Sequence, residues 1–190
     1  DVIDRWAADR TKLAIILVDD EGNEENYTFW DMKMRSNKFA NILKNAGLKK
    51  GDVVMVFLPR VIEWWESLLG IMKIGAISAP GTTQQTSRDI KYRIVSARAK
   101  AIITDAANAD KVGAIAAECP DLQIKIVTGG HNRPGWINYQ AEMKTADRYF
   151  EAVETRSEEG TMIYFTSGTT GYPKMVWHSH ASYPYAHKVT

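Results

Sequence analysis

The apolar positions of this chain fall into short uninterrupted runs, and stretches with helical apolar spacing separate most of these runs. Uninterrupted runs are typical of strands that are covered on both faces of a sheet. They predict strands over residues 13–18, 53–58, 77–80, 101–104, 124–128 and 161–165. Apolar residues at helical spacing predict helices over residues 28–46, 61–74, 87–97 and 108–118. Strands that alternate with helices favour an α/β fold, a mostly parallel sheet with helices on both faces.

Local signals refine three of these elements. Thr28 and Asp31 have the spacing of a capping box that begins the first helix, and Gly47 ends that helix. Residues 13–18 carry only apolar side chains, so we expect a buried strand. Three apolar residues of the helix over residues 87–97 are expected to face the core: Ile90, Ile94 and Val95.

Charge and composition narrow the classes of function. The 190 residues contain 24 Lys and Arg against 23 Asp and Glu, and a net charge of +1 predicts no general attraction to nucleic acid. Apolar residues make up 45% and charged residues 25% of the chain, as in ordinary globular proteins. The single cysteine, Cys119, excludes an internal disulfide and a multi-thiolate zinc site. The longest nearly apolar stretch, residues 68–80, contains Lys73 and is too short to predict a membrane span.

The densest motif follows the last predicted strand. Its glycines let the backbone approach a ligand closely, so that successive N–H groups can form an anion nest. Its hydroxyl side chains add hydrogen-bond donors, its lysine adds a positive charge, and its proline stiffens the end of the loop. This combination predicts a polyphosphate site formed by Thr166, Ser167, Gly168, Thr169, Thr170, Gly171, Tyr172, Pro173 and Lys174.

Three other loop patterns are excluded. A Walker loop has four residues between its glycines, whereas two separate Gly168 from Gly171. No G-x-G-x-x-G dinucleotide fingerprint occurs in the sequence. Ser167 does not fit the nucleophile elbow of a serine hydrolase, because Phe165 stands where the elbow needs glycine.

Residues 164–174 resemble the phosphate-loop motif of the adenylate-forming (acyl-CoA synthetase) superfamily. Weaker similarities to that superfamily lie at Tyr27-Thr28-Phe29 with Asp31-Met32 and over residues 69–76. Further stretches are similar to the medium-chain acyl-CoA synthetases: Leu58-Pro59-Arg60 with Glu63-Trp64-Trp65, residues 80–84, and Asp89-Ile90 with Tyr92-Arg93. Together the resemblance covers residues 5–188.

The resemblance implies that residues 1–190 are the N-terminal, ATP-binding part of a large adenylating domain. The rest of that domain and the small C-terminal domain are absent, so we expect a piece of a longer acid–thiol ligase of fatty acid and lipid metabolism. Such a ligase activates a medium-chain, short or branched-chain carboxylic acid with ATP to acyl-AMP and pyrophosphate, and then forms the CoA thioester. The implied cofactors are ATP, Mg²⁺ and CoA, with residues 166–174 holding the β- and γ-phosphates. No catalytic residue is assigned in this chain, which we expect to be inactive by itself.

The residues that follow the motif carry a second set of hypotheses. Trp177 and His178 are assigned to the acyl pocket, with core packing as the alternative for Trp177 and capping or packing for His178. His178 and His180 form an H-x-H pair, yet no other ligand-rich segment supports a metal site, so none is predicted. Trp64 and Trp65 are expected to pack in the core or against another domain.

Two other functions stay open. The chain can belong to an adenylating enzyme that loads an acyl group onto a carrier protein, or to a non-catalytic nucleotide-binding module. The expected partners are small molecules, no nucleic acid and no membrane span are predicted, and a homo-oligomer is left open. The expected compartment is the cytoplasm, or the mitochondrial matrix for a eukaryotic protein.

Overall fold

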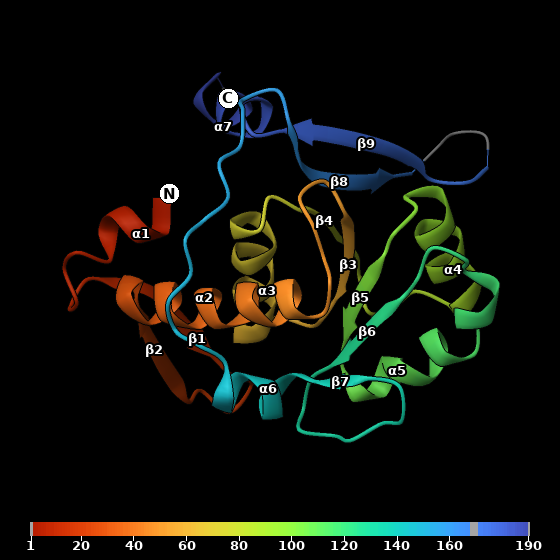
Figure 1. The fold of residues 1–190 in the computed structure, drawn as a ribbon, viewed down its shortest axis with the longest axis horizontal. Helices are drawn as coiled ribbons and strands as arrows, with labels where there is room; N and C mark the ends of the chain where they lie inside the picture. Colours follow the sequence, from red (N-terminus) through yellow and green to blue (C-terminus); the bar gives the residue numbers. More distant parts are fainter. Residues whose placement is uncertain (1, 168–170, 190) are drawn as a thin grey trace.

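The structure is a computed structural model that describes residues 2–167 and 171–189, and a seven-stranded sheet lies at its centre (Figure 1). From one edge to the other, the strands are β7 (Ile137–Asn138), β6 (Ile124–Val127), β5 (Ala101–Thr104), β3 (Val53–Phe57), β4 (Ile77–Pro80), β8 (Gly160–Thr166) and β9 (Lys174–Ser179). Neighbouring strands run parallel, except for the antiparallel pair of β8 and β9. The predicted α/β fold with a mostly parallel sheet is confirmed.

Helices cover both faces of this sheet (Figure 1). One layer contains α2 (Phe29–Asn45), α3 (Ile62–Lys73) and α6 (Tyr139–Thr145), and the other contains α4 (Ser87–Ser96) and α5 (Ala106–Gly113). Strand β3 shows why the sequence folds this way, because successive strand residues point to opposite faces. Val54 and Val56 pack into the core of the first layer, whereas Met55 and Phe57 pack into the core of the second. An uninterrupted apolar run is what such a strand requires.

Capping boxes begin two of the helices. The Thr28 hydroxyl accepts a hydrogen bond from the N–H of Asp31, and the Asp31 carboxylate accepts one from the N–H of Thr28, as the sequence predicts for α2. Thr86 and Asp89 form the same arrangement at the start of α4. Both boxes satisfy backbone donors that the first helical turn leaves without partners.

Helix α5 differs from its predicted bounds. It begins before residue 108, because the Asp105 carboxylate accepts a hydrogen bond from the N–H of Asn108 and caps the helix there. It ends at Gly113, and the predicted continuation is the short 3₁₀ helix η1 (Ala116–Glu118). The Asp105 cap, rather than the spacing of apolar residues, therefore determines where this helix begins.

The expectation that residues 13–18 form a buried strand is wrong. They form β1 (Leu13–Val18), which pairs with β2 (Glu24–Thr28) in a two-stranded antiparallel ribbon outside the main sheet (Figure 1). The ribbon contacts α2, and the side chains of Leu13, Ile16 and Val18 stay 46, 52 and 55% exposed. Because the ribbon lies outside the main sheet, neighbouring elements bury only one of its faces.

One side chain of α4 also departs from expectation. Ile90 and Ile94 face the core as predicted, but Val95 is 43% exposed, since one residue further along a helix is a rotation of about 100°. Trp64 packs against the core, one of its two expected roles. Trp65 is 44% exposed and meets the Trp64 ring edge-on, so its packing against another domain stays a prediction.

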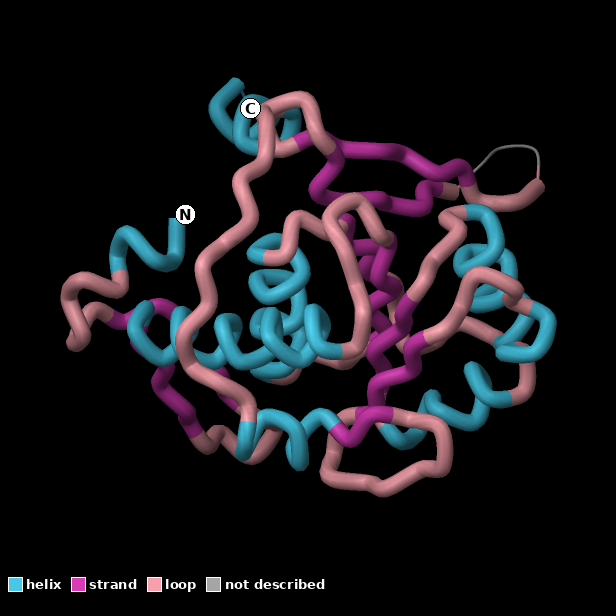
Figure 2. The backbone as a smooth tube through the Cα atoms, viewed as in Figure 1, coloured by secondary structure: helices cyan, strands magenta, loops and turns pink. Residues whose placement is uncertain are grey.

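A long extended segment, residues 146–159, connects α6 to β8 and passes over the outer side of α2 (Figure 2). Side chains of α2 hold its backbone. The Asn37 amide donates a hydrogen bond to the carbonyl oxygen of Arg148, and the Asn41 amide donates to those of Asp147 and Tyr149. These contacts guide the chain back across the molecule to the edge where β8 joins β4.

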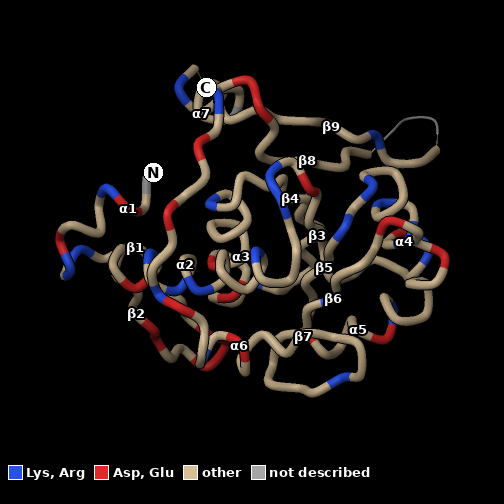
Figure 3. Tube along the Cα trace, viewed as in Figure 1, with Lys and Arg blue, Asp and Glu red and all other residues tan. Residues whose placement is uncertain are grey.

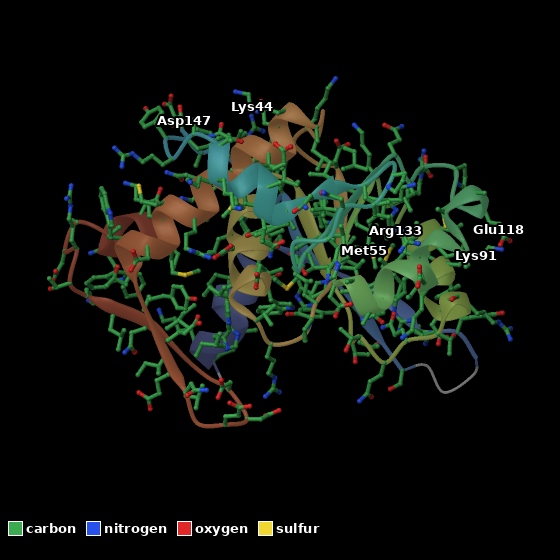
Figure 4. All side chains as sticks on the ribbon, turned by 90° about the horizontal axis from the view of Figure 1, so that it is seen from below. Lys44, Met55, Lys91, Glu118, Arg133 and Asp147 are labelled. Atoms are coloured by element: carbon green, nitrogen blue, oxygen red, sulfur yellow. The ribbon has the colours of Figure 1, made fainter. Side chains whose placement is uncertain are left out.

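Charges of both signs are interspersed along the chain (Figure 3). Exposed ion pairs join neighbouring elements, such as Lys91 of α4 with Glu118 of η1 (Figure 4) and Arg133 with Asp110 of α5, and such pairs add little stability. The remaining helices, α1 (Val2–Trp6) and α7 (Ser182–Val189), lie towards the two ends of the chain. Within residues 2–167 and 171–189, no helix combines the length and apolar character that a membrane crossing needs.

Candidate functional site

The predicted polyphosphate loop joins β8 to β9 at the edge of the sheet. Thr166 pairs with Lys174, so the ends of the loop are held together by the antiparallel hairpin. Because β8 runs parallel to β4, the loop leaves the sheet at the carboxyl end of parallel strands, where open α/β sheets bind ligands. The described members are Thr166, Ser167, Gly171, Tyr172, Pro173 and Lys174, whereas Gly168, Thr169 and Thr170 lie outside the described residues.

The described ends of the loop present polar groups at the surface. Thr166, Ser167 and Lys174 are exposed, and the Thr166 Oγ1 atom lies 3.5 Å from the carbonyl oxygen of Lys174. Gly171 has a φ of +128°, a backbone conformation that favours glycine. Two hydroxyls and one ammonium group therefore lie within one hairpin end, and this donor set suits an anion.

The last part of the loop rests on α4. The Tyr92 hydroxyl donates a hydrogen bond to the carbonyl oxygen of Pro173 (2.9 Å), and the Arg88 guanidinium donates one to the Tyr172 hydroxyl (2.8 Å). The rings of Tyr92 and Tyr172 stack with centroids 4.6 Å apart. Sequence reasoning did not assign Arg88 or Tyr92 to the site.

Trp177 and His178 are neighbours in β9, so their side chains lie on opposite faces of the hairpin. The structure therefore does not bring them together on one wall. Trp177 is 50% exposed, and its indole lies so close to Gly160 that a Cβ there would be 2.6 Å from the ring. The His178 imidazole meets the Tyr164 ring edge-on, with centroids 5.6 Å apart.

His180 turns away from the loop towards the N-terminal part of the chain. It lines a cavity of about 270 Å³ together with Asp4, Lys73 and Thr155. Its Nε2 atom is buried and finds no hydrogen-bond partner among the described residues, and burial lowers the pKa of this imidazole. The part of the chain that the structure describes holds no group of three or more His, Cys, Asp or Glu side chains that could bind a metal ion.

Comparison with known proteins connects this site to a family. The profile of the family described as AMP-binding enzyme matches residues 4–189. Acyl-coenzyme A synthetase ACSM5, mitochondrial, from Rattus norvegicus is 44% identical to this chain over 96% of the chain and 33% of the relative. The relative named acyl-coenzyme A synthetase ACSM3, mitochondrial, from Mus musculus is 43% identical with the same coverage.

Two solved structures share the fold. The crystal structure of the anthranilate CoA ligase AuaEII in complex with anthranoyl-AMP matches 99% of this chain and 36% of its own, with a TM-score of 0.89 and 25% identity. The crystal structure of the Brucella canis acyl-CoA synthetase matches 93% of this chain and 32% of its own, with a TM-score of 0.82 and 30% identity.

The chain spans about a third of the length of the curated relatives that it matches. The family match nevertheless extends over almost all of the chain, including the β8–β9 hairpin that carries Thr166 and Lys174. The chain therefore belongs to the AMP-binding enzyme family.

Proposed function

We propose that this chain is the N-terminal, nucleotide-binding part of an acyl-CoA synthetase that acts on a medium-chain, short or branched-chain carboxylic acid. The observation that carries the proposal is the hairpin of β8 and β9, whose ends place Thr166, Ser167 and Lys174 at the carboxyl edge of the sheet. The names of the relatives, which are acyl-coenzyme A synthetases and a CoA ligase, support the reaction class.

The proposed reaction has two steps. A carboxylate oxygen attacks the α-phosphorus of ATP, the bond from that phosphorus to the bridging oxygen breaks, and pyrophosphate leaves. The thiol of CoA then loses its proton and attacks the acyl carbon, and AMP leaves with the electrons of the acyl–oxygen bond. In the first step the departing pyrophosphate gains negative charge, which the Thr166 and Ser167 hydroxyls and the Lys174 ammonium would stabilise.

Magnesium enters this proposal only with the nucleotide. The described residues offer no cluster of carboxylates or histidines that would hold the ion by themselves. Since Mg²⁺ is commonly bound by substrate phosphates with few protein ligands, it is treated as part of the MgATP substrate.

The acceptor of the acyl group separates the proposal from its alternatives. The printed names of the relatives favour CoA over a carrier protein. A non-catalytic nucleotide-binding module would bind ATP at the same loop without activating any acid. The names of the curated relatives also favour the mitochondrial compartment over the cytoplasm.

The test is ATP–pyrophosphate exchange by the full-length protein that contains this chain, measured across a panel of straight and branched acids. We expect acid-dependent exchange, and a Lys174→Ala variant should lower it about 10²–10³-fold, the usual cost of removing one oxyanion partner. Acyl-CoA formation in the same assays tests the acceptor. Nucleotide binding without exchange for any acid would favour the non-catalytic module.

A further inference from the structure

Tyr92 of α4 contacts both sides of the hairpin that carries the candidate phosphate loop. Its ring stacks on Tyr172 at 4.6 Å and lies edge-on to Phe165 of β8 at 6.3 Å. Its hydroxyl donates a hydrogen bond to the carbonyl oxygen of Pro173, 81 residues further along the chain. One partly buried side chain thus connects the strand that enters the loop with residues 171–173, named here the outgoing arm.

Arg88 and Arg93 add contacts from the same helix. Arg88 lies four residues before Tyr92, on the same side of α4, and donates a hydrogen bond to the Tyr172 hydroxyl at 2.8 Å. The Arg93 guanidinium lies 5.3 Å from the centre of the Phe165 ring. Helix α4 therefore contacts the side chain of Tyr172 and the backbone of Pro173 in the outgoing arm. It also contacts the ring of Phe165 in β8.

The outgoing arm is itself stiff. The Pro173 ring fixes its own φ, and it restricts the preceding residue, Tyr172, to extended conformations. The contacts from α4 act on these same two residues, which directly precede Lys174. Because Pro173 restricts the chain and α4 holds it, the position of the Lys174 backbone is set before any ligand binds. Binding then costs less conformational entropy.

We propose that Tyr92, assisted by Arg88, is a positioning residue that holds the outgoing arm so that Lys174 is aligned for the β- and γ-phosphates of ATP. The inference rests on the function proposed above. Neither Tyr92 nor Arg88 touches the phosphates; both act through Tyr172 and Pro173.

The first test removes single contacts in the full-length protein. Tyr92→Phe deletes the hydrogen bond to Pro173 and keeps the stacked ring, and we expect the KM for ATP in pyrophosphate exchange to rise about 2–10-fold with kcat nearly unchanged. Tyr92→Leu also deletes the stack and should raise the KM further, so that the Phe variant is a partial rescue. The affinity for AMP, which lacks the β- and γ-phosphates, should stay the same in both variants.

The matched control is Tyr149→Phe, which removes a hydroxyl from a tyrosine that is 73% exposed in the segment after α6. It should leave every constant unchanged. Equal losses of ATP and AMP affinity in Tyr92→Phe would overturn the proposal, because they would indicate a general structural effect. An unchanged KM for ATP in Tyr92→Leu would overturn it as well.

A second measurement needs no activity. Amide hydrogen exchange of a peptide that covers residues 171–176 should be faster in Tyr92→Phe than in the wild-type protein without nucleotide, because the anchor of the outgoing arm is weakened. Unchanged exchange would overturn the proposed hold on the arm even in an active enzyme. If the wild-type protein shows no pyrophosphate exchange with any acid, the proposed function fails and so does the alignment for ATP, whereas faster amide exchange still identifies the anchor.

Discussion

The indole of Trp177 lies against Gly160, and a Cβ at residue 160 would stand 2.6 Å from three atoms of the ring. Gly160 begins β8, so the indole covers the end of the hairpin opposite to the candidate phosphate loop. The absence of a side chain at residue 160 is thus what permits Trp177 its present position. A change at either residue should be felt at the other.

A Gly160→Ala variant should displace the indole and lower the free energy of unfolding. We expect a loss of about 1–3 kcal/mol, the usual cost of adding a methyl group to a closely packed site, with the low end favoured because Trp177 is 50% exposed and can move outward. Urea unfolding followed by tryptophan fluorescence measures it. In a Trp177→Leu background the same change should cost clearly less, and equal losses in both backgrounds would contradict the contact.

The place of Trp177 in the sequence predicts a role in the acyl pocket, and that hypothesis has its own test. Replacing Trp177 with glycine in the full-length protein should shift kcat/KM towards longer or bulkier acids, by about 10–200-fold per added methylene group accommodated. The control is Trp65→Ala, which removes a tryptophan of α3 that is also half-exposed. An unchanged acid profile would leave Trp177 with its packing on Gly160 as its role.

Much of the fold could be predicted because the central strands of the main sheet carry mostly apolar residues on both faces. The runs that form β3 and β5 have this property, and these two strands pair with each other in parallel. The run that became β1 has the same composition, yet it lies outside the sheet, since a run of apolar residues does not say which neighbour will cover it. Strand β9 carries Lys174, His178 and Ser179 among apolar residues at the sheet edge, so it gave no comparable signal.

The candidate site was predictable only in its local part. Residues 166–174 are contiguous, and their types alone indicate an anion site. The contacts of Arg88 and Tyr92 with Tyr172 and Pro173 join residues at least eighty positions apart, and the topology of β4, α4 and β8 decides them. Short helix α6 was also missed, although Asn138 caps it with a hydrogen bond from the N–H of Ala141.

A buried polar network offers a prediction about stability. The Glu66 carboxylate on α3 is fully buried and accepts hydrogen bonds from Arg35 of α2 and from the Tyr139 hydroxyl of α6. Burial raises the pKa of Glu66 even though Arg35 acts in the opposite direction. Tyr139→Phe should lower the free energy of unfolding by about 1–3 kcal/mol, because one carboxylate oxygen loses a partner.

Glu66→Ala should cost at least as much as Tyr139→Phe, about 1–3 kcal/mol, because it leaves the buried Tyr139 hydroxyl without its partner, whereas the Arg35 side chain is 40% exposed and can be solvated by water. Tyr185→Phe, at a tyrosine that is 67% exposed, is the matched control and should change stability by less than about 0.5 kcal/mol. Urea titrations at pH 7 measure all three variants. A Tyr139→Phe protein as stable as the control would show that its hydroxyl is not needed by Glu66.

The buried imidazole of His180 predicts a dependence of stability on pH. Burial lowers the pKa of His180 below its ordinary value of 6.5, so between the folded and unfolded pKa values the unfolded state binds more protons than the folded state. Its contribution to stability is therefore present above pH 6.5 and is lost as the pH falls from there through the folded pKa. The buried Nε2 atom has no hydrogen-bond partner among the described residues, and the Lys50 ammonium adds to the effect of burial, whereas the Glu159 carboxylate opposes it. In urea titrations, a His180→Phe variant should lose less stability than the wild-type protein between pH 7.5 and pH 5. The control is His131→Gln, at an exposed histidine in the loop after β6, and its loss of stability should match that of the wild-type protein. Parallel pH profiles for His180→Phe and the wild-type protein would show that the pKa of this histidine is the same in the folded and the unfolded state.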